Sequence, residues 1–254
     1  MQRFMNRLHG KNILITGASS GIGRHFAKAL CVQGATVIAA ARRMSALDEL
    51  AAEASGSGRI LPLELDVTNV AGIDAAIAEA ERKAGPLDVL VNNAGIAPVR
   101  RALETGVEEF DAMFSTNVRG SFFVAQAVAR RMVATGRQGR IVNTASVAGM
   151  VVMPQLTAYG MTKAAVIHMT RCLAVEWARF GIAVNAICPG YVETELNADF
   201  LASEAGQKVV SGLPRRRAAT VADLEAVLLM LVDSEAARCI SGAAIPVDDA
   251  YSLM

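Results

Sequence analysis

The segment Thr16-Gly17-Ala18-Ser19-Ser20-Gly21-Ile22-Gly23 joins an apolar run of strand length, Asn12–Thr16, to a stretch of helical period, Ile22–Gln33. Glycine permits a tight turn and lets the backbone approach a ligand closely. The N–H groups and the positive dipole at a helix start stabilise a bound anion. A glycine-rich turn alone is weak evidence, because such a turn can also bind nothing. Its position in the first strand-helix unit favours a pyrophosphate site made by Gly17, Ser19, Ser20, Gly21, Ile22 and Gly23.

The alternation of a short apolar run with a helical stretch repeats along the chain. The further expected strands are Thr36–Ala40, Ile60–Glu64, Asp88–Val91, Arg140–Ala145, Ala183–Ile187 and Ala243–Val247. The further expected helices are Ser45–Ala54, Val70–Ala84, Val107–Thr135, Ala158–Phe180 and Val221–Asp233. Strands flanked by helices bury both faces, and right-handed crossovers join them. We therefore expect an α/β fold with a doubly wound parallel sheet of about seven strands, helices on both faces and ligands at the strands' carboxyl ends.

Length and composition favour one domain that spans residues 1–254. The chain has 254 residues, of which 53% are hydrophobic and 19% charged, so it can bury a sizeable core. The high apolar content also hints at an oligomer. One long interval, Pro189–Thr220, has no clear strand or helix, although a short helix near Asn197–Val210 is possible. We expect this interval to be a lid over the substrate.

Charge and cysteine usage exclude several classes of function. The formal net charge is +1, which gives no overall field to hold nucleic acid or an anionic membrane. The four cysteines are far apart and fit no metal-ligand spacing, so no metal is expected. Met1–Asn12 lacks an apolar run of signal-peptide length, and no stretch has membrane-spanning length. We expect a cytoplasmic protein whose partner is a small molecule.

Three further motifs occur in order after later strands. They are Leu65-Asp66-Val67 after the third, Asn92-Asn93-Ala94-Gly95 after the fourth, and Pro189-Gly190-Tyr191-Val192-Glu193-Thr194 after the sixth. Together with the first turn, which differs from G-x-G-x-x-G, they resemble the short-chain dehydrogenase/reductase family, single-domain type, over nearly the whole chain.

This resemblance implies a Rossmann-type fold that binds a nicotinamide dinucleotide. It places Asp66, with Val67 beside it, at the adenine ring, and Asn93, Ala94 and Gly95 along the adenosine side. It places Pro189, Gly190, the backbone near Val192 and the Thr194 hydroxyl at the nicotinamide carboxamide.

Residues at the end of the second strand favour NADP(H) over NAD(H). An NAD-specific site usually has a carboxylate there, which accepts both ribose hydroxyls and repels a 2′-phosphate. This chain has Ala41 at that position, followed by Arg42 and Arg43. Arginine binds phosphate bidentately and stays charged. The alternative is that both arginines are solvated loop charges.

A tyrosine and a lysine four residues apart, Tyr159 and Lys163, fall on one face of the helix after the fifth strand. Free tyrosine has a pKa of about 10, so proton transfer near neutrality requires that the phenolate be stabilised, which we expect from the neighbouring ammonium and the cationic nicotinamide. Ser146 lies just past the fifth strand, where its hydroxyl can meet the substrate oxygen. The resemblance implies that Asn117, Ser146, Tyr159 and Lys163 are a catalytic tetrad and that the lysine also holds the nicotinamide ribose. Taken singly, each of these residues has an ordinary structural explanation.

The expected substrate pocket is mostly apolar, which favours an apolar ketone or a 3-oxoacyl thioester. Its residues are Val147, Met150, Val151, Val152, Met153, Gln155, Leu156 and Tyr191. The chain is similar to 3-oxoacyl-carrier-protein reductases: Arg137 matches one of their carrier-docking arginines, but Val175 stands where the other is expected. The alternatives are a sugar or polyol dehydrogenase and a sensor that binds NADP(H) without turnover. The resemblance also implies a homotetramer, with Val107–Thr135 and Ala158–Phe180 at one interface.

Overall fold

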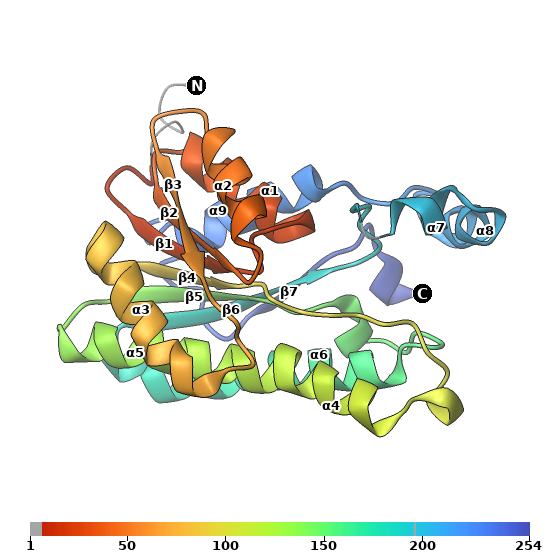
Figure 1. Ribbon diagram of the computed structural model, residues 1–254. Helices are drawn as coiled ribbons and strands as arrows, with labels where there is room; N and C mark the ends of the chain where they lie inside the picture. The colour runs from red at the N-terminus through yellow and green to blue at the C-terminus, as the bar shows by residue number, and fades with distance from the viewer. Residues whose placement is uncertain (1–6, 196) are drawn as a thin grey trace.

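The strands form one parallel sheet in the order β3-β2-β1-β4-β5-β6-β7 (Figure 1). The computed structural model describes residues 7–195 and 197–254. The strands are β1 Asn12–Thr16, β2 Thr36–Ala41, β3 Arg59–Glu64, β4 Val89–Asn92, β5 Gly139–Thr144, β6 Ile182–Pro189 and β7 Ala244–Val247. The order reverses between β1 and β4, which puts a ligand crevice at their carboxyl ends. The expected doubly wound fold is confirmed.

Helices cover both faces of the sheet (Figure 1). One face carries α1 Gly21–Val32, α2 Met44–Ala52 and α9 Glu225–Val232; the other carries α3 Val70–Ala84, α4 Val107–Phe114, α5 Ser121–Ala134 and α6 Thr157–Trp177. Side chains of β1 alternate between these layers, since Ile13 and Ile15 pack with α1 and α9 while Leu14 packs with α3 and α5. Within residues 7–195 and 197–254, no helix is long and apolar enough to cross a membrane.

The helix expected over 107–135 is interrupted. A π-helical segment, Ser115–Gly120, separates α4 from α5 and contains Asn117. A Cβ atom added to Gly120 would lie 2.8 Å from the carbonyl oxygen of Val67, so glycine lets this segment pack closely on the chain after β3. Helical bulges of this kind are frequent at functional sites.

The interval 189–220, which we call the lid segment, contains two short helices where one was predicted. They are α7 Ala198–Ala202 and α8 Glu204–Gly212, and both extend away from the sheet in Figure 1. Leu196 in this interval lies outside the described residues. The two ends of the lid segment are joined, because Ala219 N–H donates to Tyr191 O (2.8 Å) and Glu193 N–H donates to Ala219 O (2.8 Å). The lid segment therefore projects from the body of the protein, and its two ends lie side by side.

Candidate active site

The turn between β1 and α1 has the geometry of a phosphate site. Gly17 and Gly21 have φ angles of 67° and 53°, the left-handed region that favours glycine. A Cβ added to Gly23 would lie 2.3 Å from Gly17 O, so no side chain fits there. The Ser20 side chain makes no capping bond at the start of α1, which leaves the helix N-terminus to face a ligand. The residues present thus fit a pyrophosphate.

Residues after β4 hold this turn in place. The Thr16 hydroxyl accepts hydrogen bonds from the N–H groups of Asn93 and Ala94, both at 3.0 Å. The Asn93 amide donates to Thr16 O (3.2 Å) and to Gly17 O (3.3 Å). These bonds fix the turn against β4 and give Asn93 and Ala94 a structural role; their place along a bound adenosine stays a prediction.

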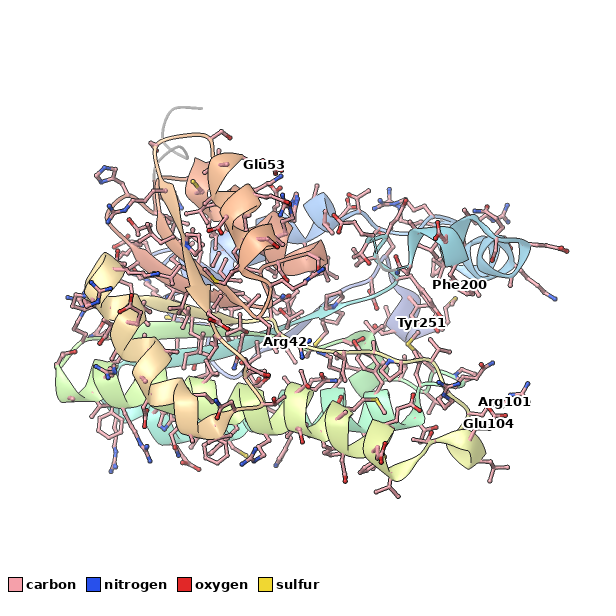
Figure 2. All side chains as sticks on the ribbon, viewed as in Figure 1. Arg42, Glu53, Arg101, Glu104, Phe200 and Tyr251 are labelled. Carbon is pink, nitrogen blue, oxygen red and sulfur yellow. The ribbon has the colours of Figure 1, made fainter. Side chains whose placement is uncertain are left out.

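Arg42 and Arg43 lie beside the same turn. Arg43 donates to the hydroxyls of Ser19 (3.0 Å) and Ser20 (2.9 Å), so its guanidinium is held at the mouth of the turn. Arg42, labelled in Figure 2, is exposed, and its charge contributes to lowering the pKa of Asp66. Hydrogen bonds from Thr68 are the larger cause of that shift, at 2.7 Å from the hydroxyl and 2.9 Å from the N–H. The two arginines therefore bring positive charge to the mouth of the turn, and the Asp66 carboxylate beyond β3 is firmly ionised.

Ser146, Tyr159 and Lys163 come together after β5. Tyr159 and Lys163 are one turn apart on α6, and Lys163 Nζ lies 5.5 Å from the centroid of the tyrosine ring. Lys163 Nζ donates to Thr144 O (2.8 Å), which ties α6 to the end of β5. Ser146 is hydrogen-bonded to the Tyr159 phenol, and its hydroxyl also accepts from Ala148 N–H (3.1 Å). This set can pass a proton to or from an oxygen atom of a ligand.

Burial dominates the electrostatics of this set. Burial raises the pKa of Tyr159 to about 12, and the hydrogen bond to Ser146 opposes that rise only in part. Burial likewise lowers the pKa of Lys163 to about 8, against a smaller opposing effect of Cys188. For each of the two groups, removal from water is the largest cause of its shift. Acidification of the phenol by the ammonium together with a cationic nicotinamide stays a prediction for the cofactor-bound protein.

Asn117 is linked to Tyr159 through the Thr162 hydroxyl. Its amide donates to Ile96 O (2.9 Å) and to the Thr162 hydroxyl (3.0 Å), and its Oδ1 accepts from Ile96 N–H (2.8 Å). The Thr162 hydroxyl in turn donates to Tyr159 O (2.7 Å). Sequence reasoning missed Thr162, although a hydroxyl between a tyrosine and a lysine of one helix face was a usable signal.

The loop after β4 brings the two halves of the site into contact. A Cβ added to Gly95 would lie 3.3 Å from Asn117 Oδ1 and 3.6 Å from Lys163 Nζ. The backbone that follows Asn93 and Ala94 therefore passes directly beside the lysine. The glycine turn and the tyrosine set share one edge of the sheet.

The segment after β6 faces the glycine turn. A Cβ added to Gly21 would lie 3.8 Å from Thr194 Cβ, so the turn and the Thr194 side chain are neighbours. The Thr194 hydroxyl is hydrogen-bonded to Asn197 Oδ1 (3.2 Å), and the Asn197 amide donates to Val192 O (2.9 Å). Pro189 ends β6, and Gly190 packs closely on Asp248, where a Cβ would meet a carbon at 2.8 Å.

The residues expected to line a substrate pocket are not uniform. Val147 is 1% exposed and belongs to the interior, whereas Val152 is 93% exposed. Gln155 has a φ of 64°, which turns the loop before α6 sharply. Tyr191 lies edge-on to Tyr251, with ring centroids 5.5 Å apart, a contact that no local pattern predicts.

Comparisons with known proteins point to one family. A family model described as short chain dehydrogenase matches residues 11–205. The chain is 36% identical to the NAD-dependent glycerol dehydrogenase of Listeria innocua, across 96% of this chain and 94% of that protein. It is 38% identical to the 3-oxoacyl-(acyl-carrier-protein) reductase of Thermotoga maritima, across 95% and 98%. A crystal structure of a short-chain type dehydrogenase/reductase from Mycobacterium marinum superposes with a TM-score of 0.90 at 38% identity, covering 96% of both chains.

Proposed function

The chain belongs to the short-chain dehydrogenase family and is an oxidoreductase, and we propose that it moves a hydride between NADP(H) and a ketone or secondary alcohol. One observation carries this proposal: the glycine turn and the Ser146, Tyr159 and Lys163 set lie at the same edge of the sheet. Gly95 joins them, since its backbone is within reach of Lys163 Nζ. A bound dinucleotide that lies along this edge would bring its nicotinamide to the tyrosine.

The bound cofactor would supply or accept the hydride, and the chain's own residues would manage the proton. Tyr159 is the proton donor to the carbonyl oxygen, and the Ser146 hydroxyl stabilises negative charge as it develops on that oxygen. Lys163, tied to Thr144 O, keeps a positive charge next to the tyrosine ring. Asn117 acts through its bonds to Ile96 and Thr162, which fix the loop and the helix around the set.

The raised pKa of Tyr159 is compatible with the role of proton donor in a reduction. At about 12 the phenol keeps its proton at neutral pH. A developing alkoxide is a much stronger base than a phenolate, so proton donation to it is downhill. The reverse reaction needs the phenolate, which requires more positive charge near the ring than this chain supplies by itself.

The preference for NADP(H) is supported by charge and geometry. Arg43 is already held on the hydroxyls of Ser19 and Ser20, and Arg42 stands exposed beside it. Ala41 offers no carboxylate that would repel a 2′-phosphate. The relative from Listeria innocua is named as NAD-dependent, so NAD(H) is the competing cofactor.

For the substrate we propose an apolar ketone or a 3-oxoacyl thioester. Support comes from Met150, Val151, Val152 and Met153, which form an apolar run directly after the Ser146 turn. The name of the Thermotoga maritima relative agrees with the second of these substrates. A sugar or polyol dehydrogenase is the second candidate, favoured by the name of the glycerol dehydrogenase relative and by the polar Gln155 at the same loop.

A substrate panel tests this function. Oxidation of NADPH is followed by its absorbance with apolar ketones, acetoacetyl-CoA and quinones, and reduction of NADP⁺ with sugars and polyols. We expect turnover with ketones or the thioester. Turnover with polyols alone would replace the apolar assignment by the second candidate. Cofactor binding without turnover on any substrate would favour a sensor.

We also propose that the chain acts as a homotetramer of single-domain subunits whose lid segment closes over the substrate. Exposed apolar side chains on α4, α5 and α6 support an interface there, since Val107 is 77% exposed and Val175 80% exposed. Light scattering of the purified protein measures the mass. A monomer at micromolar concentration would contradict the proposed assembly.

A further inference from the structure

Left-handed backbone at residues other than glycine occurs in three loops of the described chain. Among the described residues, Gln155, Arg216, Asp249 and Ala250 have positive φ angles, of 64°, 52°, 51° and 69°. Gln155 precedes α6, Arg216 lies in the lid segment, and the other two are consecutive in the turn after β7. Such strain persists only where surrounding contacts hold it, and it marks functional sites.

Two acidic residues hold the turn after β7. The Asp248 carboxylate accepts hydrogen bonds from the N–H groups of Ala250 (3.1 Å) and Ser252 (2.8 Å), which closes the turn on itself. The Asp249 carboxylate instead reaches the lid segment. Its Oδ1 lies 3.0 Å from Arg215 Nη1, and its Oδ2 lies 2.9 Å from Arg217 Nε, the latter an ion pair without hydrogen-bond geometry. One carboxylate thus joins the turn to two arginines of the lid segment.

Arg217 extends this connection to the body of the protein. Its Nη1 lies 2.9 Å from Asp223 Oδ2, and the Asp223 carboxylate also accepts from Thr220 N–H (2.7 Å). Thr220 and Asp223 form the capping box of the helical turn that leads into α9. The returning end of the lid segment is therefore fixed between α9 and the turn after β7, with Asp249 as the common anion.

The same turn places an aromatic ring on the substrate side. Tyr251 meets Tyr191 with ring centroids 5.5 Å apart and an interplanar angle of 80°. Tyr191 follows β6 and Tyr251 follows β7, and Ser146 follows β5, so the three residues succeed the carboxyl ends of three neighbouring strands. In the view of Figure 2, Tyr251 lies between the lid helices, where Phe200 is labelled, and the layer of α6. Burial raises the pKa of Tyr191, with Tyr251 adding to the rise.

We propose that Asp249 is a positioning residue that sets a substrate-selecting wall made by Tyr191 and Tyr251. Its ion pairs to Arg215 and Arg217 hold the lid segment and Tyr251 in one arrangement. In an edge-on pair, the ring whose edge points at its partner keeps both faces free, and such a face can pack against a flat apolar body. The wall therefore favours a ketone with a planar or ring-shaped body over a small acyclic ketone. The preference for a ring-shaped ketone rests on the proposed function. The ion pairs that join the turn after β7 to the lid segment do not depend on it.

Hydrogen exchange tests the connection without any substrate. In Asp249→Asn, amides of residues 198–212 exchange about three- to tenfold faster than in the wild type, the range that two partly exposed ion pairs can supply. Amides of α6 exchange at the wild-type rate. The matched control is Arg216→Gln, which removes a charge from the same run. Within residues 7–195 and 197–254, the bond found for Arg216 runs from its backbone N–H to Leu213 O, so the side chain is free to change. Unchanged exchange in Asp249→Asn, or equal acceleration in both variants, overturns the proposal.

Steady-state kinetics test the wall. With a ring-shaped ketone, Tyr251→Ala and Asp249→Asn raise KM about tenfold while kcat stays within about twofold. With a small acyclic ketone KM is unchanged, and the Kd for NADPH is unchanged in all variants. Asp249→Glu, which keeps the charge, restores part of the lost selectivity. Equal changes for both ketones overturn the selecting role. Absence of turnover in the wild type refutes the proposed function. The hydrogen-exchange comparison still tests whether Asp249 holds the lid segment to the turn after β7.

Discussion

The turn after β1 and the lid segment are both needed for the proposed chemistry, but they are held by different forces. In the turn, backbone contacts and glycine fix the geometry, since a Cβ on Gly23 would meet Gly17 O at 2.3 Å. In the lid segment, the fixing groups are side chains in ion pairs, and Arg215 is 63% exposed. Exposed pairs contribute little and are readily exchanged for others. The part that we propose to meet the cofactor is thus rigid, and the part that we propose to meet the substrate is easily altered.

The sharpest way to break this comparison is Gly23→Ala. Helix propensity favours alanine in α1 by about 1 kcal/mol, but the steric conflict with Gly17 O is far larger. We expect the Kd for NADPH to rise at least about a hundredfold and the thermal midpoint to fall. Titration with NADPH and thermal unfolding measure both. Gly106→Ala is the matched control, because nothing lies within 4 Å of its added Cβ. Wild-type affinity in Gly23→Ala would show that the turn is not rigid.

Lys163→Met should have the next largest effect. We expect kcat to fall about a hundredfold or more, since proton transfer beside the ring loses its fixed charge. In the wild type the reductive rate should decline as pH rises through about 8, where Lys163 loses its proton. A wild-type rate that stays flat from pH 7 to 9 would contradict this assignment.

The same lysine makes a prediction about stability. Its pKa falls from 10.5 in the unfolded chain to about 8 in the fold, so between these values the unfolded chain binds more protons. Stability from this group therefore increases as pH rises through that window, and Lys163→Met lacks this increase. Denaturant unfolding of both proteins between pH 7 and 10 measures the difference. A difference that does not vary with pH would refute the assigned pKa.

Cofactor preference tests the rigid turn after β1 and the arginines beside it. Ala41→Asp and Arg43→Ala should each lower the ratio of kcat/KM for NADPH to kcat/KM for NADH by about ten- to a hundredfold. This is the effect expected from losing one charged hydrogen bond to the 2′-phosphate, or from placing a repelling carboxylate beside it. Arg59→Ala is the control, since this exposed arginine bonds Thr36 at the other end of β2. An unaltered ratio in both variants would remove the 2′-phosphate pocket from the account.

The smallest effect is expected from Thr162→Val. This substitution leaves the Asn117 amide short of one buried partner, at a cost of about 1 to 3 kcal/mol in the free energy of unfolding. We expect kcat to fall severalfold and KM to remain constant. Thr162→Ser keeps the hydroxyl and should restore kcat. Loss of activity in the serine variant as well would assign the effect to packing and not to the hydrogen bond.

The fold and the cofactor turn were predictable because their signals are local. Strand and helix periods gave all seven strands, and the spacing of Gly17, Gly21 and Gly23 located the turn. The break at Ser115–Gly120 was not predictable, since a π-helical segment carries no distinct periodicity.

Two features of the candidate site depend on the tertiary structure. The direction of the Tyr159 pKa shift is the balance of burial against hydrogen bonding, and neither can be read from the spacing of Tyr159 and Lys163. The ion pair of Arg215 could not be predicted either, because its partner Asp249 lies in the turn after β7, beyond any local pattern.

Tyr159→Phe tests the central claim most directly, because it removes one hydroxyl and leaves the ring. NADPH binding and single-turnover reduction of an accepted ketone are measured on the same preparation. The account predicts a Kd for NADPH within about twofold of the wild type and a rate reduced by about a hundredfold or more. A wild-type rate with the phenylalanine in place would contradict it.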